Sequence, residues 1–217
     1  MSESDWLSVS VGTFSMPSAK EIMQRHRIAL VALALSLVSV AAHGQQTQIK
    51  LDPAKTRIAW TLGDVLHTVE GTFALKSGNI TFDPQTGEAG GQLVVDAASG
   101  NSGNGMRDSK MKKDVLEAQR YPEIVFTPKH VSGFVSGKDN QTVQVAGDFT
   151  IHGASHPLTL TLPVTINGSH VEAQTKFDVP YQQWGMKNPS TLFLKVSNTV
   201  QIAITAAGDL QTTATAR

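Results

Sequence analysis

Alternating apolar and polar residues run through most of the second half of the chain, and they constrain its fold more than any other feature. In residues 143–151 and 171–179 every second side chain is apolar or small, and the residues between them are mainly polar. Period-two alternation puts one set of side chains on each face of a strand, which is typical of half-buried antiparallel strands. We therefore predict strands at residues 57–62, 68–75, 78–82, 92–96, 123–131, 143–151, 158–166, 171–179 and 200–205.

Turn-forming residues separate these predicted strands. Asp83-Pro84-Gln85-Thr86-Gly87, residues 136–140 and Asn167-Gly168-Ser169 all carry residue types that tolerate tight or left-handed turns. Gly147, inside a predicted strand, indicates a bulge or a sharp bend. About nine strands at short spacing, without alternating helices, favour a β-sandwich or a closed barrel.

One short helix is expected within this β-rich chain, at residues 109–119. Asp108 or Ser109 can cap its first turn, because a short side-chain oxygen accepts a free backbone N–H there. Pro122 forces Tyr121 out of helical geometry and is expected to end the helix. A helix this short needs to dock on the sheet. We interpret it as a lid or plug over one barrel end, with an apolar stripe of Met111, Val115, Leu116 and Ala118.

The N-terminal region, residues 1–44, has the order of a secretory signal. Lys20, Arg25 and Arg27 precede an apolar run at 28–42, and Ala42-His43-Gly44 resembles a cleavage site. A transmembrane anchor usually needs about 20 apolar residues, so this run is too short for one. We predict a cleavable signal peptide with the mature domain at 45–217, and leave the translation start open between Met1, Met16 and Met23.

Composition excludes several classes of protein. The chain has no cysteine, so it has no disulfide, no thiolate metal site and no lipid-anchored cysteine. It has 18 basic and 18 acidic residues, and removal of 1–44 takes away three of each, leaving 15 and 15. A neutral domain gives no electrostatic reason to expect nucleic acid or an anionic membrane surface as a partner, and we predict no stable membrane insertion. We expect a periplasmic or secreted protein.

Sites for catalysis or metal binding are weak in this sequence. His152 and His156 lie four residues apart, but Gly153 and Pro157 make this a connection between strands rather than a helix face. We interpret His152 as a turn histidine bonded to nearby backbone. There is no Gly-x-Ser-x-Gly elbow of a serine hydrolase and no phosphate-binding Gly-rich loop with its lysine. We therefore predict no catalytic residue and no metal ligand.

Arg107-Asp108 allows two interpretations. The pair either fixes the start of the helix as an ion pair or cap, which we favour, or presents Arg107 to a phosphate or acidic head group at the barrel mouth. The large aromatic residues also have two interpretations, because a barrel of about eight strands is either filled by side chains or holds one ligand.

A series of short motifs in a fixed order resembles one known family, the YceI-like polyisoprenoid-binding proteins. The likeness extends over residues 48–208. Its motifs are Leu51-Asp52-Pro53, His67 with Gly71-Thr72-Phe73, Gly78-Asn79-Ile80 with Asp83-Pro84, Arg107-Asp108, Tyr121-Pro122-Glu123-Ile124 with Phe126, residues 147–153, and Trp184-Gly185-Met186. Residues 98–103 and 181–185 depart from the family pattern near the predicted barrel mouth, which leaves the bound lipid open.

The resemblance implies an all-β, antiparallel, lipocalin-like β-barrel of about eight strands that binds a lipid rather than catalyses a reaction. The implied ligand is an isoprenoid or similar chain, such as a quinone or polyprenyl tail, with no other cofactor. The ligand-binding residues predicted on this basis are Trp60, Phe73, Phe126, Phe149, Phe177, Trp184, Arg107 and His152.

Two alternatives remain open at this point. One is an enzyme, such as a hydrolase, that acts on a small or lipid substrate with His152 or His67 as acid or base. The other is a ligand-free barrel, filled by its own side chains, that serves as a stress or interaction module. An imidazole that opens into a cavity beside a carboxylate would favour the first, and a fully packed interior the second. The sequence leaves open whether the protein forms a homodimer.

Overall fold

The computed structural model describes residues 45–63, 68–190 and 195–214. The predicted signal peptide, the three candidate start residues and His67 lie outside the described residues.

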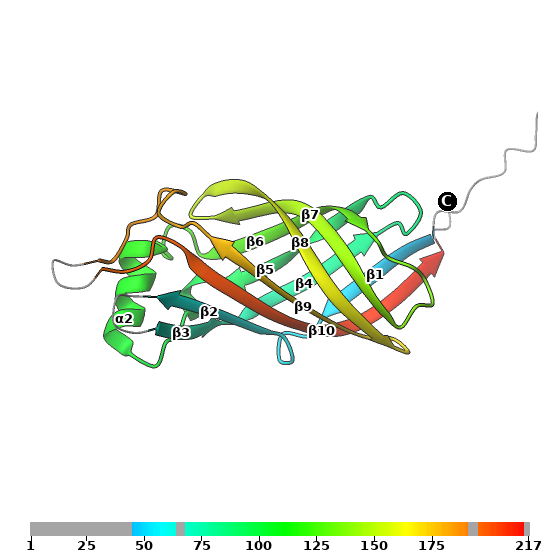
Figure 1. Cartoon of the computed structure of the whole chain (residues 1–217), viewed down its shortest axis with the longest axis horizontal. Helices are drawn as coiled ribbons and strands as arrows, with labels where there is room; N and C mark the ends of the chain where they lie inside the picture. The colour runs from blue at the N-terminus through cyan, green and yellow to red at the C-terminus, as the bar shows by residue number, and fades with distance from the viewer. Residues whose placement is uncertain (1–44, 64–67, 191–194, 215–217) are drawn as a thin grey trace, which may run out of the picture. The chain divides into compact units, whose positions relative to one another are not determined.

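The described residues form ten strands in one antiparallel sheet (Figure 1). The sheet order is β1-β4-β5-β6-β7-β8-β9-β10-β2-β3, and it closes because β1 also pairs with β10. The strands are β1 (Gln45–Leu51), β2 (Arg57–Gly63), β3 (Thr68–Phe73), β4 (Leu75–Phe82), β5 (Ala89–Asp96), β6 (Glu123–Ser132), β7 (Asn140–Ile151), β8 (Ala154–Asn167), β9 (His170–Val179) and β10 (Val200–Ala214).

The ten strands occupy eight positions around a closed barrel. Strands β1 and β2 follow one another along β10, since Ile49 pairs with Leu210 and Trp60 pairs with Ile202. Strand β3 runs into β4 with only Ala74 between them, and these two pair with β2 and β1 respectively. The prediction of an antiparallel barrel of about eight strands is confirmed.

Two parts of the sheet were not predicted. The segment Gln45–Leu51 is a full strand although it is largely polar, because it is held between β4 and β10 on its two edges. Strand β10 continues to Ala214, beyond the predicted end at residue 205, because its second half pairs with β1 and β9. Both extensions depend on partners that are distant in the sequence, which local patterning does not reveal.

The helix begins earlier than predicted. It consists of α2 (Gly105–Lys110) followed by a π-helical turn, η2 (Met111–Val115). Asn104 is the cap, since its side chain accepts a hydrogen bond from the backbone N–H of Arg107 at 3.1 Å. The predicted start at residue 109 and the predicted caps are therefore wrong, because Asp108 is already inside the helix and bonds elsewhere.

The helix also ends earlier than Pro122 requires. The Leu116 N–H donates to the carbonyl of Met111, and Glu117 then takes a left-handed conformation with φ +45°. The predicted end at residue 119 is therefore wrong, because the backbone turns at Glu117. No helix in the described residues has both the length and the hydrophobicity that a membrane crossing requires.

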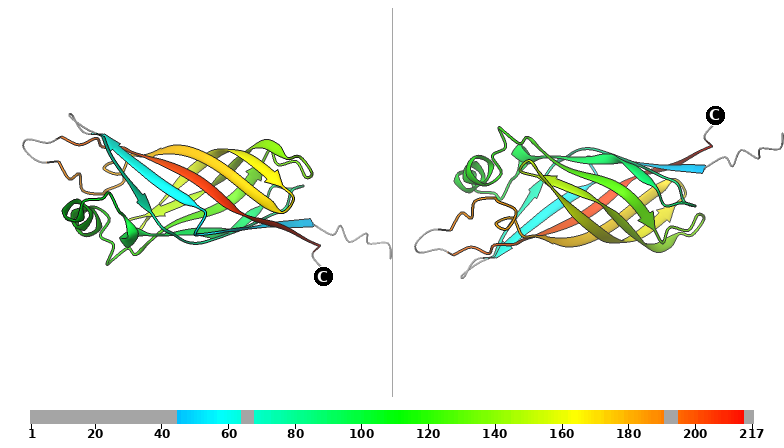
Figure 2. Two further views of the ribbon diagram at one scale, coloured as in Figure 1. Left: turned by 90° about the horizontal axis from the view of Figure 1, so that it is seen from below. Right: turned by 90° about the horizontal axis from the view of Figure 1, so that it is seen from above.

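The barrel has two different ends. Helix α2 lies at one end, and β1 starts and β10 finishes at the other (Figures 1 and 2). At the end opposite α2 the rings of Phe82 and Phe134 pack edge to face with centroids 4.9 Å apart. Gln141 secures the turn beside them by accepting from the Val135 N–H and donating to the Lys138 carbonyl. We call this the blind end of the barrel.

Candidate ligand-binding cavity

A cavity of about 460 Å³ lies in the half of the barrel next to α2, and we call it the upper chamber. Its wall comes from strands that are far apart in the sequence, through Ile58, Trp60, Val95, Ile151, Val179 and Ile202. Cavities that bind small molecules usually measure about 300–1,000 Å³ and are mostly apolar, with a few placed polar groups. The upper chamber has the size and the wall of such a site.

The helical segment 105–116 covers the upper chamber, and we call it the lid. Met111, Val115 and Leu116 line the chamber, and Leu116 is only 8% exposed. The predicted apolar stripe of the helix therefore faces the barrel. Met106 also lines the chamber although it is 85% exposed, which indicates that the chamber opens to solvent beside this residue.

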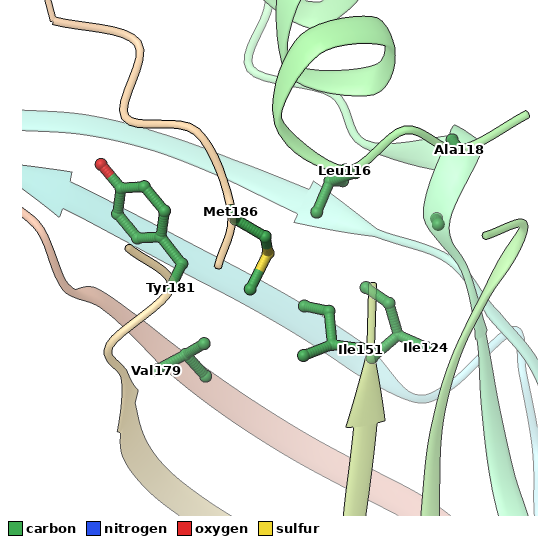
Figure 3. Packing of buried hydrophobic residues seen from close by; sticks show 8 residues of the cluster. Leu116, Ala118, Ile124, Ile151, Val179, Tyr181 and Met186 are labelled. Carbon is green, nitrogen blue, oxygen red and sulfur yellow. The ribbon is translucent and has the colours of Figure 1, made fainter. Parts of the chain in front are cut away.

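Residues 181–186, which follow β9, pack beneath the lid. Met186 and Tyr181 are almost fully buried and lie with Leu116 and Ile151 between the lid and the strand ends (Figure 3). The Tyr181 hydroxyl donates to the carbonyl of Ser197 at 2.6 Å. Burial raises the pKa of this hydroxyl above its ordinary value, so it stays protonated as a donor.

Arg107 and Asp108 hold the start of the lid through Ser102. The Asp108 carboxylate accepts from the Ser102 N–H at 2.9 Å and from its hydroxyl at 2.5 Å. The Arg107 guanidinium donates to the Ser102 hydroxyl at 2.7 Å and to its carbonyl at 3.0 Å. The Ser102 hydrogen bond, helped by the charges of Lys112 and Arg107, lowers the pKa of Asp108. The pair fixes the start of the helix, as the favoured interpretation expected, but it does so through Ser102 and not as an ion pair or a cap.

Charged groups of the upper chamber gather at the lid. Among the described residues that line it, only Arg107 and Lys110 carry charge. The Lys110 ammonium lies 3.4 Å from the carbonyl of Pro189, which also lines the chamber. Two cations therefore stand where the chamber meets solvent, and the wall below them is apolar.

A second, smaller cavity of about 110 Å³ occupies the half of the barrel towards the blind end, and we call it the lower chamber. It is lined by residues such as Leu51, Phe82, Val143, Leu160 and Ala206. Thr175 is the one polar residue among the described residues of its lining, and its hydroxyl donates to the Thr161 carbonyl at 3.2 Å. The lower chamber offers only apolar surface.

Sequence comparison identifies the family of this barrel. A model of the YceI-like domain matches residues 49–207, from within β1 to within β10. The chain belongs to the YceI-like family. A UPF0312 protein of Pseudomonas putida strain W619 is similar, with 30% identity over 152 residues, 67% of this chain and 75% of that protein. A UPF0312 protein of Vibrio parahaemolyticus is 32% identical over 94 residues, 42% of this chain and 48% of that protein.

Solved structures share the YceI-like fold. BcnA of Burkholderia cenocepacia superposes with a TM-score of 0.59 at 21% identity, covering 72% of this chain and 98% of BcnA. A polyisoprenoid binding domain from Saccharophagus degradans, implicated in plant cell wall breakdown, superposes with a TM-score of 0.59 at 17% identity, covering 75% and 98%. The family resemblance seen in the sequence motifs is confirmed.

The YceI-like barrel brings most of the predicted ligand-binding residues to its interior. Trp60, Phe73, Phe149, Phe177 and Arg107 line the upper chamber. Phe126 lines the lower chamber instead. These positions are those expected of ligand contacts, and their role in binding stays a prediction.

Trp184 and His152 are not among the described residues that line either chamber. The Trp184 indole stacks on the His156 imidazole, with centroids 3.9 Å apart, and packs at a tilt against Phe149 at 5.9 Å. It therefore supports a residue of the chamber wall. We no longer expect Trp184 to contact the ligand directly.

His152 sits in the turn between β7 and β8 in a left-handed conformation, with φ +51°. Its Nε2 lies 3.3 Å from the Glu117 carboxylate, and its ring packs against Tyr121 with centroids 4.7 Å apart. The imidazole is beside a carboxylate but does not open into either chamber. His152 is a turn histidine, as interpreted, but its partner is the Glu117 side chain rather than nearby backbone, and it lies away from both chambers.

Two glycines make room for aromatic rings of the chamber walls. A Cβ on Gly71 would overlap the Trp60 indole, which lies across this position of β3. A Cβ on Gly147 would meet the Thr127 carbonyl and would lie 2.9 Å from the Phe126 ring. The irregular pairing predicted at Gly147 occurs in its partner strand, since the register of β6 shifts between Pro128 and His130.

Several lining residues were not predicted from the sequence. Met106 precedes the predicted helix start at residue 109, and Lys110 is not part of the apolar stripe that was expected to dock on the sheet. Met186 was noted only as a family motif, although it is 2% exposed and lines the upper chamber. The apolar stripe of the lid was the one signal that pointed to this side of the chamber.

Proposed function

We propose that this YceI-like protein is an exported binding protein that holds an isoprenoid or other long-chain lipid in its upper chamber. The observation that carries the proposal is a cavity of about 460 Å³ with an apolar wall and a charged entrance. The structural likeness to a protein described as a polyisoprenoid binding domain supports it. The signal-like order of residues 1–44 supports export.

The chamber matches the chemistry of a prenyl chain. Each methylene buried from water contributes about 0.8 kcal/mol, so an apolar tail needs few polar contacts for tight binding. Arg107 already donates hydrogen bonds from its Nε and one terminal nitrogen to Ser102, whereas Lys110 makes one long contact, to the carbonyl of Pro189. Lys110 is therefore the better placed cation for an anionic or strongly polar head group at the entrance.

Trp60 lines the chamber, and a small shift of its indole would bring a polar group, the buried Nε1–H, to the chamber surface. Its side chain is 4% exposed and its Nε1 has no hydrogen-bond partner among the described residues. An unpaired buried donor costs free energy, which a bound acceptor offsets. We infer that a carbonyl or ether oxygen of the ligand, as in a quinone, accepts from this N–H.

Binding is favoured over the two alternatives left open by the sequence. The enzyme hypothesis relied on His152 or His67; His152 lies beside Glu117 in a turn and lines neither chamber, and His67 lies outside the described residues. The filled-barrel hypothesis required a fully packed interior, whereas the structure holds two cavities. The inferred role is therefore the capture and carriage of a lipid.

The test is native mass spectrometry on protein purified from a bacterial periplasm without detergent, followed by titration of the stripped protein with a polyprenol and a quinone. The proposal predicts a co-purified lipid mass or stoichiometric uptake of one of the two probes. A clean apo mass with no uptake of either probe would contradict it.

A further inference from the structure

Three phenylalanines stand between the two chambers. On β7 the inward-facing residues pass from Val145, which lines the lower chamber, to Phe149, which lines the upper one. On β9 the same change occurs between Thr175 and Phe177. Phe126, which pairs with Phe149 across β6 and β7, completes the layer. We call Phe126, Phe149 and Phe177 the partition.

The partition is made of side chains alone. The Phe149 and Phe177 rings meet edge to face, with centroids 5.8 Å apart. Both pack against the buried clusters on either side of the layer, the one around Met186 and the one around Phe82. Both rings are nevertheless only half-buried, since one side of each faces the upper chamber. A change of rotamer can therefore join the chambers without moving a strand.

Small residues create the space below the partition. Ala173 and Ala206 are paired across β9 and β10, and both line the lower chamber. Ile204 lines both chambers and gives them a continuous wall on β10. An apolar cavity of about 150 Å³ is enough for one benzene-sized molecule, so the lower chamber is on the scale of one isoprene unit.

We infer that the lower chamber is a second apolar subsite, which takes the far end of long prenyl chains, and that Phe149 and Phe177 set the chain length the protein prefers. The inference rests on the proposed function, because it needs a tail in the upper chamber. A chain that fills the upper chamber meets the partition. A longer chain displaces the rings and continues towards Phe82 and Phe134 at the blind end.

The experiment measures the affinity of stripped protein for a ladder of all-trans prenols that lengthens by one isoprene unit at a time. Phe177→Ala opens the partition, and it is expected to shift the preferred chain length upward and to favour longer over shorter prenols by about tenfold. Phe177→Leu keeps most of the ring's volume and serves as the control for folding, with a smaller shift.

A second variant reduces the volume of the lower chamber itself. Ala173→Leu fills the lower chamber without touching the partition, so the double variant Phe177→Ala/Ala173→Leu is expected to lose the preference for longer chains. If Phe177→Ala only loosened the barrel in general, added bulk at Ala173 would not cancel its effect. The reversal is therefore expected only if the lower chamber is a second subsite.

The outcomes are distinct. An upward shift in Phe177→Ala that Ala173→Leu reverses supports the inference. Prenol binding with the same length profile in wild type and Phe177→Ala overturns the inference and leaves the proposed function standing. Absence of binding to every prenol in the wild type overturns the inference, and if the protein also takes up no quinone it overturns the proposed function as well.

Discussion

Arg107 and Asp108, neighbours in the sequence, bind the same serine hydroxyl, Arg107 as donor and Asp108 as acceptor. Through Ser102 they tie the start of the lid to the segment that precedes it. The Ser102 segment continues to Asn101, whose N–H and carbonyl pair with Thr72 of β3. The lid is therefore fastened to the barrel wall at its first turn, and its stability depends on the charge of one carboxylate.

Asp108→Asn is expected to lower the thermal midpoint near neutral pH by a few degrees, because the amide is a weaker acceptor for Ser102. The pKa of Asp108 is lowered in the folded protein, so its contribution is complete above the ordinary Asp pKa of about 3.9 and is lost as pH falls through the folded value. The difference between wild type and variant should shrink below about pH 4. Thermal melts across this range, with Asp139→Asn at the blind end as control, provide the check. A constant difference at every pH would contradict this role of Asp108.

Gly147→Ala is expected to destabilise the barrel by about 1–3 kcal/mol, because its Cβ would press on the Thr127 carbonyl and the Phe126 ring. Gly63→Ala is the matched control, since a Cβ there meets no atom of the described residues within 4 Å. Denaturant unfolding of the two variants measures the free energy of each. If the two variants had equal free energies of unfolding, the packing of the Phe126 ring would not depend on the absence of a Cβ at Gly147.

Trp60→Phe is expected to weaken binding of a prenylated quinone by about 3- to 10-fold, because it removes the N–H but keeps an aromatic ring in the chamber. Binding of a hydrocarbon without an acceptor should change much less. Trp184→Phe, which alters a residue that lines neither chamber, is the matched control. If both variants affect quinone binding equally, Trp60 does not recognise the ligand through its N–H. Calorimetric titration of the three proteins is the measurement.

Lys110→Gln is expected to weaken binding of a prenyl phosphate by about two- to fivefold at low salt, since an exposed charge pair is worth little more than this. The effect should fade as ionic strength rises, and binding of the uncharged prenol should stay the same. Lys138→Gln, in the turn at the blind end, carries the same charge change away from the entrance. A loss of phosphate binding in Lys138→Gln of the same size would place the head group elsewhere.

The strands that alternate cleanly were predictable because each contains its own signal. Residues 143–151 and 171–179 lie in β7 and β9, and the apolar residues at alternate positions of each range form the inner face of the strand, as the period-two pattern indicates. Gln45–Leu51 carries no such signal except at Ile49 and Leu51, and is a strand because β4 and β10 hold it on both sides. Pairing of this kind depends on residues that are 29 or more positions away.

The site was predictable in part for the same reason. Trp60, Phe149 and Phe177 were identified because large apolar residues on inward faces are either core or cavity lining, and the barrel is not filled at their level. Trp184 was misplaced because it comes from a non-strand segment, where no alternation indicates the direction of a side chain. Met106 was missed because Asn104, not Asp108, caps the helix, and several residues can cap equally well by sequence alone.

The most direct test of the account is native mass spectrometry of two proteins purified in parallel without detergent, the wild type and Val69→Trp. Val69 lines the upper chamber from β3, so an indole at this position occupies space that the ligand needs. Wild-type protein is expected to carry a lipid or to take up a polyprenol or quinone, and folded Val69→Trp is expected to carry far less. Equal lipid occupancy in both proteins would place the ligand outside the upper chamber.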